Sequence, residues 1–285
     1  MTAGQAAGGR PLPVTVVIPT FNRAADLPRS IGSLAAQRGT GLRVIVVDNS
    51  SSDPTEEVIR SLQPAWEGRL DYVRKEPQGP ASARNRGLAA ATTPYVMFMD
   101  SDVEVPPDWI PNALAHLEAD PSLAAAGGLI LYAFDPTRVN AYGGDLGVSG
   151  LAWDVEEGTL REVARRPEDR IWINCSAMLV RTEALRRVDG FDEAYFYGYE
   201  DSDVGWRLNL AGERVAVFPP PAPHGSAVGV GRRVGRGKDV LHRQRNSLER
   251  SGNLSRSEGL IRGGRGSKRG VGTYRHERAK EGIIS

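Results

Sequence analysis

The sequence predicts an α/β fold in which helices cover both faces of a mostly parallel central sheet. Short β-branched runs alternate with helix-like segments between residues 14 and 99, an order typical of strand–helix–strand units. Polar residues follow the strand-like runs, as expected where a parallel sheet ends in a binding site. The chain has 285 residues, which is enough for one large domain with an ample core.

Four short apolar strands are expected. The first is a run of β-branched residues, which pack well in a sheet that is covered on both faces. The expected strands span residues 14–19, 42–47, 70–74 and 95–99.

Three helices are expected between these strands. After the first strand, Leu27, Ile31 and Leu34 recur at helical spacing, and Asn22 precedes them as a candidate cap. An aspartate followed by proline is typical of a helix start, and a second such helix is expected on this basis. The second and third helices are expected to open at 53–54 and to span 82–90.

Three polar segments follow expected strands at their carboxyl ends. Ligands of open α/β sheets bind beyond these ends. The segments are residues 20–22, 48–50 and 100–102. Their coincidence at one edge of the sheet predicts a nucleotide site.

Asp100 and Asp102 follow the last of these strands, one residue apart. Residues i and i+2 of an extended chain point to the same side, so the two carboxylates are expected to converge. Two hard oxygen ligands suit a divalent cation that also holds phosphate oxygens. A pair of solvated turn residues is the alternative that the spacing alone leaves open.

The composition of the sequence is informative about the cellular compartment of the protein. Cys175 is the only cysteine, so no intrachain disulfide can form, which fits a reducing compartment. Residues 1–13 are rich in Gly and Ala and lack the apolar stretch of a secretory signal. No run reaches the roughly 18–20 apolar residues of a membrane span. We therefore expect a cytoplasmic protein.

The net charge of +1 hides an uneven distribution, because residues 231–285 hold fifteen Lys and Arg against five Asp and Glu. The Gly-, Ser- and Arg-rich stretch 249–285 cannot bury a core, so a disordered basic tail is expected there. Such a tail is either simply solvated or in peripheral contact with anionic lipid headgroups at the inner membrane face. Nucleic acid is the less favoured partner. The expected organisation is a flexible segment 1–12, a domain 13–248 and a tail 249–285.

Five sequence blocks, in order, resemble the motifs of glycosyltransferase family 2. They are VVIPTFNR (16–23), VVDNSSSD (46–53), GPASARNRG (79–87), MDSD (99–102), and GFDE (190–193) with YEDSDVGWR (199–207). The resemblance extends from about residue 14 to residue 224. It implies a GT-A fold, with a nucleotide-sugar half over 13–105 and an acceptor half over 106–248 on one continuous sheet.

The resemblance implies a nucleoside diphosphate sugar as donor, a UDP-, dTDP- or GDP-sugar. It places Asp48 against the base and Pro19, Thr20 and Asn22 along the nucleoside pocket. Arg84 is expected to present its planar guanidinium to base or diphosphate oxygens. From spacing alone, Asp48 fits a turn and Arg84 a solvated surface. In the same way, Thr20 and Asn22 fit helix capping.

A divalent metal ion, Mn²⁺ or Mg²⁺, is implied as cofactor. The resemblance makes Asp102 the direct ligand, with Asp100 reaching the ribose or a metal-bound water and Ser101 beside them at the nucleotide. His224 follows a proline-rich stretch and is a candidate further ligand, since neutral imidazole suits Mn²⁺ better than Mg²⁺. A structural or exposed histidine is the alternative.

Inverting transfer by single displacement needs a base that takes the proton of the acceptor hydroxyl. The resemblance points to Asp201 as this base, with Glu200 as second choice. An apolar wall raises the pKa of a carboxylate towards the working pH. Alternatively, acids in a first turn serve the helix dipole. The aromatic candidates for the wall are Phe196, Tyr197, Tyr199 and Trp206.

Other side chains near these motifs have structural or bordering roles. Asp203 is expected to pair with Arg207 at i+4. Trp109 is expected to pack under the metal loop. The acceptor pocket is expected to be bordered by residues 172–175 and 192–193.

The sequence therefore predicts a metal-dependent, inverting glycosyltransferase with a role in cell-surface polysaccharide or glycolipid synthesis. Its acceptor is expected to be a saccharide, a lipid-linked saccharide or a small molecule. A nucleotidyltransferase also uses paired aspartates and a metal, but no Gly-rich loop with Lys or Arg follows the first strand. A non-catalytic nucleotide-sugar-binding module is the second alternative.

Overall fold

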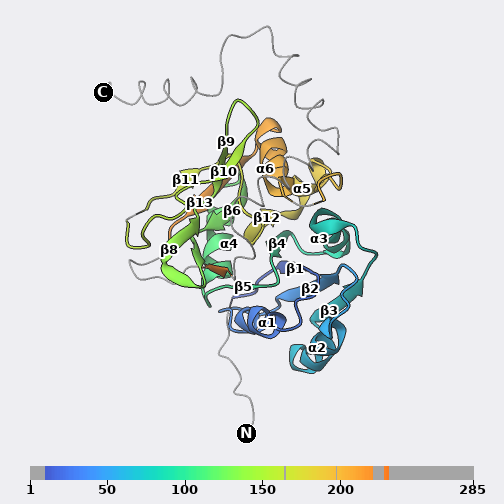
Figure 1. The fold of residues 1–285 in the computed structure, drawn as a ribbon. Helices are drawn as coiled ribbons and strands as arrows, with labels where there is room; N and C mark the ends of the chain where they lie inside the picture. The colour runs from blue at the N-terminus through green and yellow to red at the C-terminus, as the bar shows by residue number, and fades with distance from the viewer. Residues whose placement is uncertain (1–9, 164, 197, 221–227, 231–285) are drawn as a thin grey trace, which may run out of the picture.

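The structure, a computed structural model, describes residues 10–163, 165–196, 198–220 and 228–230. Its centre is an eight-stranded sheet with the order β11-β13-β6-β12-β4-β1-β2-β3 (Figure 1). In chain order these strands are β1 (Val14–Thr20), β2 (Arg43–Asp48), β3 (Leu70–Arg74), β4 (Tyr95–Met99), β6 (Leu123–Gly128), β11 (Glu168–Asp169), β12 (Ala177–Arg181) and β13 (Arg214–Phe218).

The first four strands in chain order, β1 to β4, are parallel to one another, as the sequence predicts. β1 pairs with β2 and β4, and β2 pairs with β3. The register sets Thr20 opposite Asp48, so the carboxyl ends of β1 and β2 lie level. β3 and β4 have the expected bounds, while β2 is shifted by one residue and includes Asp48.

Two strands of the large sheet, β12 and β11, run against this direction. β12 lies between β4 and β6 and is antiparallel to both. β13 is parallel to β6, and the short edge strand β11 is antiparallel to β13. The sheet is therefore mixed, and its second half continues the first without a break.

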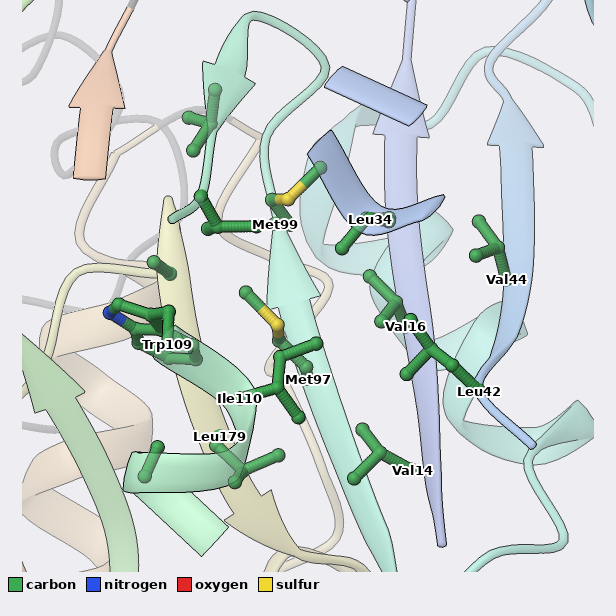
Figure 2. Close-up of a cluster of buried hydrophobic side chains, with 14 of the residues drawn as sticks. Val14, Val16, Leu34, Leu42, Val44, Met97, Met99, Trp109, Ile110 and Leu179 are labelled. Carbon is green, nitrogen blue, oxygen red and sulfur yellow. The ribbon is translucent and has the colours of Figure 1, made fainter. Parts of the chain in front are cut away.

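Helices cover both faces of the sheet, which confirms the expected fold class. α1 (Leu27–Ala35), α2 (Thr55–Leu62) and α4 (Trp109–Ala119) contribute to one hydrophobic cluster. Figure 2 shows its centre, where Leu34 of α1 and Ile110 of α4 lie against Val16 and Met97 from the strands. α3 (Gly79–Ala90), α5 (Thr182–Arg187) and α6 (Glu200–Leu210) contribute to the cluster on the other face. A 3₁₀ turn, η1 (Gln63–Trp66), follows α2.

Two helices begin elsewhere than expected. α1 begins at Leu27 after Asp26, so the proposed capping by Asn22 is wrong. Asn22 has a φ of 53°, and its Oδ1 accepts hydrogen bonds from the backbone N of Ser52 and Asp53, at 2.8 and 3.3 Å. It therefore holds the loop before α2. α3 begins at Gly79, three residues before the expected start.

Two smaller sheets complete the second half of the chain. One has the order β5-β14-β7-β8, and the other is an antiparallel hairpin of β9 and β10. Their bounds are β5 (Val103–Glu104), β7 (Ile130–Tyr132), β8 (Asp135–Ala141), β9 (Gly144–Leu146), β10 (Ala152–Asp154) and β14 (Val228–Val230). None of the described helices is long and apolar enough to cross a bilayer.

The ends of the chain are described only in part. Leu12 is buried, and its backbone N donates to the Thr40 O at 2.8 Å, so packed chain begins before residue 13. The expected tail at 249–285 and its contact with lipid headgroups lie outside the described residues.

Candidate active site

A cleft with a volume of about 780 Å³ lies at the carboxyl ends of β1 and β4. Segments far apart in the sequence line it: the end of β1, the start of α3, the turn after β4, the β10 strand, the chain before β12 and the start of α6. All three polar segments of the sequence reach this edge: 100–102 lines the cleft in full, and 20–22 and 48–50 do so in part. The charged residues on its wall are Arg23, Arg84, Asp100, Asp102, Asp154, Glu157, Glu200 and Asp201.

Thr20 lines the cleft at the end of β1, beside Pro19 and Phe21. The Thr20 side chain is buried, and its Oγ1 has no hydrogen-bond partner among the described residues. Its backbone O accepts a bond of 2.9 Å from Asn49 N, which fixes the strand end. A buried hydroxyl without a partner is costly, so Thr20 is poised to bond a ligand.

Asp48 is fully buried and does not line the cleft. Its Oδ1 accepts bonds from the N and Oγ of Ser51, at 2.8 and 2.6 Å. Its Oδ2 accepts a bond of 2.6 Å from the Tyr72 hydroxyl, with Arg74 Nη1 at 3.5 Å. These contacts give Asp48 the turn role that its spacing favours, while Asn49 is the neighbour that lines the cleft. A direct contact of Asp48 with a base requires Tyr72 or Ser51 to move.

Arg84 is buried rather than on a solvated surface, and it lies in the second turn of α3. Its Nη1 lies 2.8 Å from Glu200 Oε1, and its Nη2 lies 3.0 Å from Asp100 Oδ1. The guanidinium also lies over the Phe191 ring, 5.6 Å from its centroid. Arg84 therefore bridges two carboxylates from different halves of the chain, instead of presenting a free fork to phosphate.

Asp100 and Asp102 lie in the turn after β4, where Val103 N bonds to Asp100 O at 3.3 Å. A turn, and not strand alternation, therefore brings the two residues together. Asp100 is fully engaged, because Ser176 Oγ donates to its Oδ2 at 2.8 Å while Arg84 holds Oδ1. Ser101 is buried, and its O accepts a bond of 2.8 Å from Ser30 Oγ.

Asp102 has the more available carboxylate of the pair. Its nearest cation is Arg23, with Nη2 at 3.9 Å from Oδ2. Burial raises the pKa of Asp102, and the negative charge of Asp100 raises it further. A half-buried carboxylate next to another one is stabilised by a cation, and a cation shared with diphosphate oxygens needs only one or two protein carboxylates. The residues present thus fit a divalent metal.

No three His, Cys, Asp or Glu side chains gather as a metal cage within the described part of the chain. His224, the expected additional ligand, lies outside the described residues. The donor set available at this edge is therefore Asp102 together with oxygens of a ligand.

Asp201 lines the cleft in the first turn of α6. Tyr199 precedes the helix with a φ of 71°, and Asp201 Oδ1 accepts a bond of 2.9 Å from Ser202 N. Burial and, next, the charge of Glu200 raise the pKa of Asp201 to about 8, while Arg84 acts in the opposite direction. A carboxylate whose pKa lies near the working pH is suited to general-base chemistry.

Glu200 is buried, and Arg84 holds its Oε1. Its other oxygen, Oε2, is buried without a hydrogen-bond partner among the described residues. The ion pair with Arg84 occupies one of its carboxylate oxygens, which makes Glu200 the weaker candidate for the base.

The expected aromatic wall is present only in part. Phe196 and Tyr199 line the cleft, Trp206 does not, and Tyr197 lies outside the described residues. Two tryptophans complete the wall, Trp172 and Trp153, of which the second has no motif around it in the sequence.

Of the residues expected to border the acceptor pocket, only some line the cleft. From 172–175, Trp172 and Asn174 line the cleft, whereas Ile173 and Cys175 belong to the core. From 192–193, neither residue lines it. Glu193 instead accepts a bond of 2.9 Å from Asn85 Nδ2.

One structural prediction of the sequence is confirmed, and a second is confirmed in part. Asp203 pairs with Arg207 one turn later, with Oδ2 and Nη2 at 2.6 Å. Trp109 belongs to the core cluster (Figure 2) and does not line the cleft, as expected of a packing residue, while its place under the metal loop stays a prediction.

Asp154 is a wall residue that no sequence motif indicates. It ends β10 and is partly buried, and its Oδ1 has no hydrogen-bond partner among the described residues. Burial and the charge of Glu157 together raise the pKa of Asp154 to about 6, and a hydrogen bond with Asn174 opposes them. The only local signal is an acidic residue within an apolar stretch, 151–155, which is also common on ordinary hairpins.

Comparison with known families finds one match that covers more than half of the chain. The model of glycosyl transferase family 2 matches residues 15–186. This span includes the β1 and β2 ends, α3, the turn after β4 and all of β9 to β12.

Two curated relatives match by sequence. A pre-mycofactocin glycosyltransferase of Mycobacterium tuberculosis is 36% identical over 220 residues, which are 72% of this chain and 41% of the relative. A validoxylamine A glucosyltransferase of Streptomyces hygroscopicus is 31% identical over 235 residues, which are 72% of this chain and 53% of the relative. The chain thus spans about half of the length of these relatives.

Solved structures share the fold. A structure of GalNAc-T7 with UDP, GalNAc and Mn²⁺ has a TM-score of 0.64 at 18% identity and covers 78% of this chain and 44% of that one. The mannosyltransferase PcManGT of Pyrobaculum calidifontis, in complex with GDP-Man and Mn²⁺, has a TM-score of 0.57 at 24% identity and covers 81% and 60%. Both are glycosyltransferases, and their likeness confirms the expected GT-A fold.

Proposed function

This chain belongs to glycosyl transferase family 2, and on that premise we propose that it transfers a sugar from a nucleoside diphosphate sugar to a hydroxyl of an acceptor, with inversion at the anomeric carbon. The observation that carries the proposal is one cleft that joins a ligand-ready Thr20, an available Asp102 and an Asp201 whose pKa is raised to about 8. Each of these features has a separate part in the reaction.

The donor would bind at the carboxyl ends of β1 and β4. Pro19, Thr20 and Asn49 line this part of the cleft, and the Thr20 hydroxyl needs a partner that a nucleoside supplies. Asp48 and Asn22 would support donor binding indirectly. Asp48 would fix the turn after β2, and Asn22 would fix the loop before α2. Complexes of two structural neighbours with UDP and GDP-Man support a nucleotide donor.

Asp102 would hold a divalent cation together with diphosphate oxygens, and His224 stays a predicted further ligand. When bound, such a cation supplies positive charge that stabilises the diphosphate as it leaves. Mn²⁺ in the two neighbouring structures supports this cofactor. Asp100 and Arg84 would position the turn that carries Asp102.

Asp201 would act as the general base. The acceptor oxygen attacks the anomeric carbon, the bond from that carbon to the diphosphate oxygen breaks, and the diphosphate keeps the electron pair. The hydroxyl proton passes to the Asp201 carboxylate. Burial favours this uptake, because it makes the neutral carboxyl the preferred form after transfer. A role in cell-surface polysaccharide or glycolipid synthesis remains a prediction.

Calorimetric titration with UDP, GDP and dTDP, with and without Mn²⁺, tests this function. We expect one nucleotide to bind in a Mn²⁺-dependent manner, and its sugar derivative to release nucleoside diphosphate when an acceptor is present. Release of pyrophosphate would identify a nucleotidyltransferase. Donor binding without any release would identify a binding module. Failure of all three nucleotides to bind overturns the proposal.

A further inference from the structure

The hairpin of β9 and β10 is fixed against α6 through one tryptophan. Asp154 pairs with Gly144 across the hairpin. A Cβ on Gly144 would lie 1.9 Å from Cε2 of Trp172, and a Cβ on Gly205 of α6 would lie 2.4 Å from the Trp172 Cβ. Only glycine permits such close approach on both sides. Trp172 therefore sets the position of Asp154 relative to the helix that begins at Glu200.

Asp154 and Asp201 share one end of the cleft, and their charges interact. The negative charge of Asp154 contributes to the raised pKa of Asp201. No Lys, Arg or His among the described residues forms an ion pair with Asp154, and its Oδ1 lacks a hydrogen-bond partner there. Glu200, which is only 6% exposed and lines the same cleft, also has an oxygen without a partner, Oε2.

Both arginines on the cleft wall already contact other carboxylates. Arg84 pairs with Asp100 and Glu200, and Arg23 pairs with Asp26 and lies near Asp102. Among the described residues, neither Asp154 nor Asp201 forms an ion pair, although the nearby charge of Arg84 acts on Asp201, so negative charge prevails at this end of the cleft. Such a surface attracts a cation and repels an anion.

Aromatic faces stand beside this charge. Trp153 precedes Asp154 on β10 and is 46% exposed, and Trp172 lies on the same wall. The indole face carries partial negative charge and attracts cations. The Trp172 ring is held in place by a bond of 3.1 Å from its Nε1 to Asp145 O.

Building on the proposed transferase function, we propose that Asp154 is a substrate-binding residue that selects an amine-bearing saccharide as acceptor. Its buried oxygen accepts a hydrogen bond from an ammonium group of the acceptor, while a hydroxyl of the same molecule is presented to Asp201. An ammonium supplies three donors and a positive charge, which a neutral hydroxyl does not. An acceptor that carries only hydroxyls would donate a hydrogen bond to the Asp154 oxygen but would not neutralise the negative charge of the carboxylate.

The test compares three probes on the protein saturated with its nucleotide and Mn²⁺: methyl glucoside and its 2-amino and 6-amino derivatives. Calorimetry is performed at a pH at which the amines are protonated. We expect at least one amino glycoside to bind about tenfold or more tightly than the neutral one, as for a hydrogen bond to a charged group. In Asp154→Asn, which keeps the size and removes the charge, this preference falls to near unity.

Asp71→Asn is the control, because Asp71 lies on β3 in a surface pair with Arg43, 3.0 Å away, and outside the cleft. It should keep both nucleotide affinity and the amine preference. Equal affinity of the wild-type protein for the three glycosides overturns the inference, and so does the absence of binding to any of them. A preference for the amine that survives in a folded Asp154→Asn variant overturns it as well. Loss of nucleotide binding itself would instead count against the transferase function, so the two failures are distinguishable.

Discussion

Arg84 in α3 and Glu200, the first residue of α6, form a buried ion pair across 116 positions of sequence, with 2.8 Å between Nη1 and Oε1. The second terminal nitrogen of Arg84 holds Asp100, after β4. One guanidinium thus joins the turn that carries the candidate metal ligand to the helix that carries the candidate base. Replacement of Arg84 should therefore lower the stability of the folded protein more directly than it lowers the transfer rate.

Replacement of Arg84 by methionine is expected to lower the free energy of unfolding by about 3–5 kcal/mol, because it leaves a buried carboxylate without its counter-ion. Urea denaturation of the wild type and Arg84→Met measures the loss. Arg43→Met is a matched control, since Arg43 pairs with Asp71 at an exposed edge and such pairs contribute about 0–1 kcal/mol. Equal losses in the two variants would show that the buried bridge is not a stabilising element.

Thr20→Val separates a binding role from a folding role. The buried Thr20 hydroxyl has no hydrogen-bond partner in the part of the chain that the structure describes, so its removal should leave stability unchanged or slightly higher. Nucleotide affinity should fall by about 2–12-fold, the value of one hydrogen bond. Thr15→Val should show the reverse, because Thr15 Oγ1 bonds Thr93 Oγ1 at 2.8 Å away from the cleft. A destabilised Thr20→Val with normal affinity would remove Thr20 from the donor site.

Asp102→Asn is expected to abolish the effect of Mn²⁺ on nucleotide binding. The nucleotide affinity measured with Mn²⁺ should fall by about tenfold or more, since even changes behind a metal ligand cost that much. The affinity without Mn²⁺ should stay the same or rise, because one negative charge is removed from the phosphate site. Asp108→Asn, outside the cleft, serves as control. A persistent Mn²⁺ effect in Asp102→Asn would place the metal elsewhere.

The transfer rate should rise with pH up to about 8 and then level off. Asp201 takes a proton only as the carboxylate, and its pKa of about 8 leaves little of that form at lower pH. Asp201→Asn should lose about 10²–10⁴-fold in kcat, and its residual rate should lack this rise. Asp203→Asn, in the same helix but paired with Arg207, should keep the pH profile. An unchanged profile in Asp201→Asn would transfer the base role to another group.

The strands were the part of the fold most accessible from sequence. β3 and β4 have the expected bounds, and β4 is apolar and buried at every position, which marks it clearly in the sequence. Helix starts were less accessible. Asn22 has the residue type of a cap, yet its oxygen serves a loop thirty residues later, a contact that only the assembled sheet creates.

The candidate site also has features that the sequence predicts and features that it does not predict. Motifs placed Thr20, Asp102 and Asp201 at one cleft, because strand ends and helix starts are local features. The state of each carboxylate depends on distant partners. Asp48 is engaged by Tyr72, 24 positions away, and Asp100 by Ser176, 76 positions away. Asp154 has no motif at all, since its place depends on how Trp172 packs between two glycines.

The reversed direction of β12 has an evolutionary consequence. Because Ala177 at its start lies opposite Met99 at the end of β4, the chain that enters β12 arrives at the mouth where nucleotides are expected. The excursion from β7 to β12 can therefore be lengthened, shortened or exchanged without disturbing the four parallel strands. Under the proposed function, we expect such a sheet to keep one donor while its hairpins adapt to new acceptors, and grafting the 144–175 segment between relatives, which leaves Ser176 with Asp100, would be a route to redesigned selectivity.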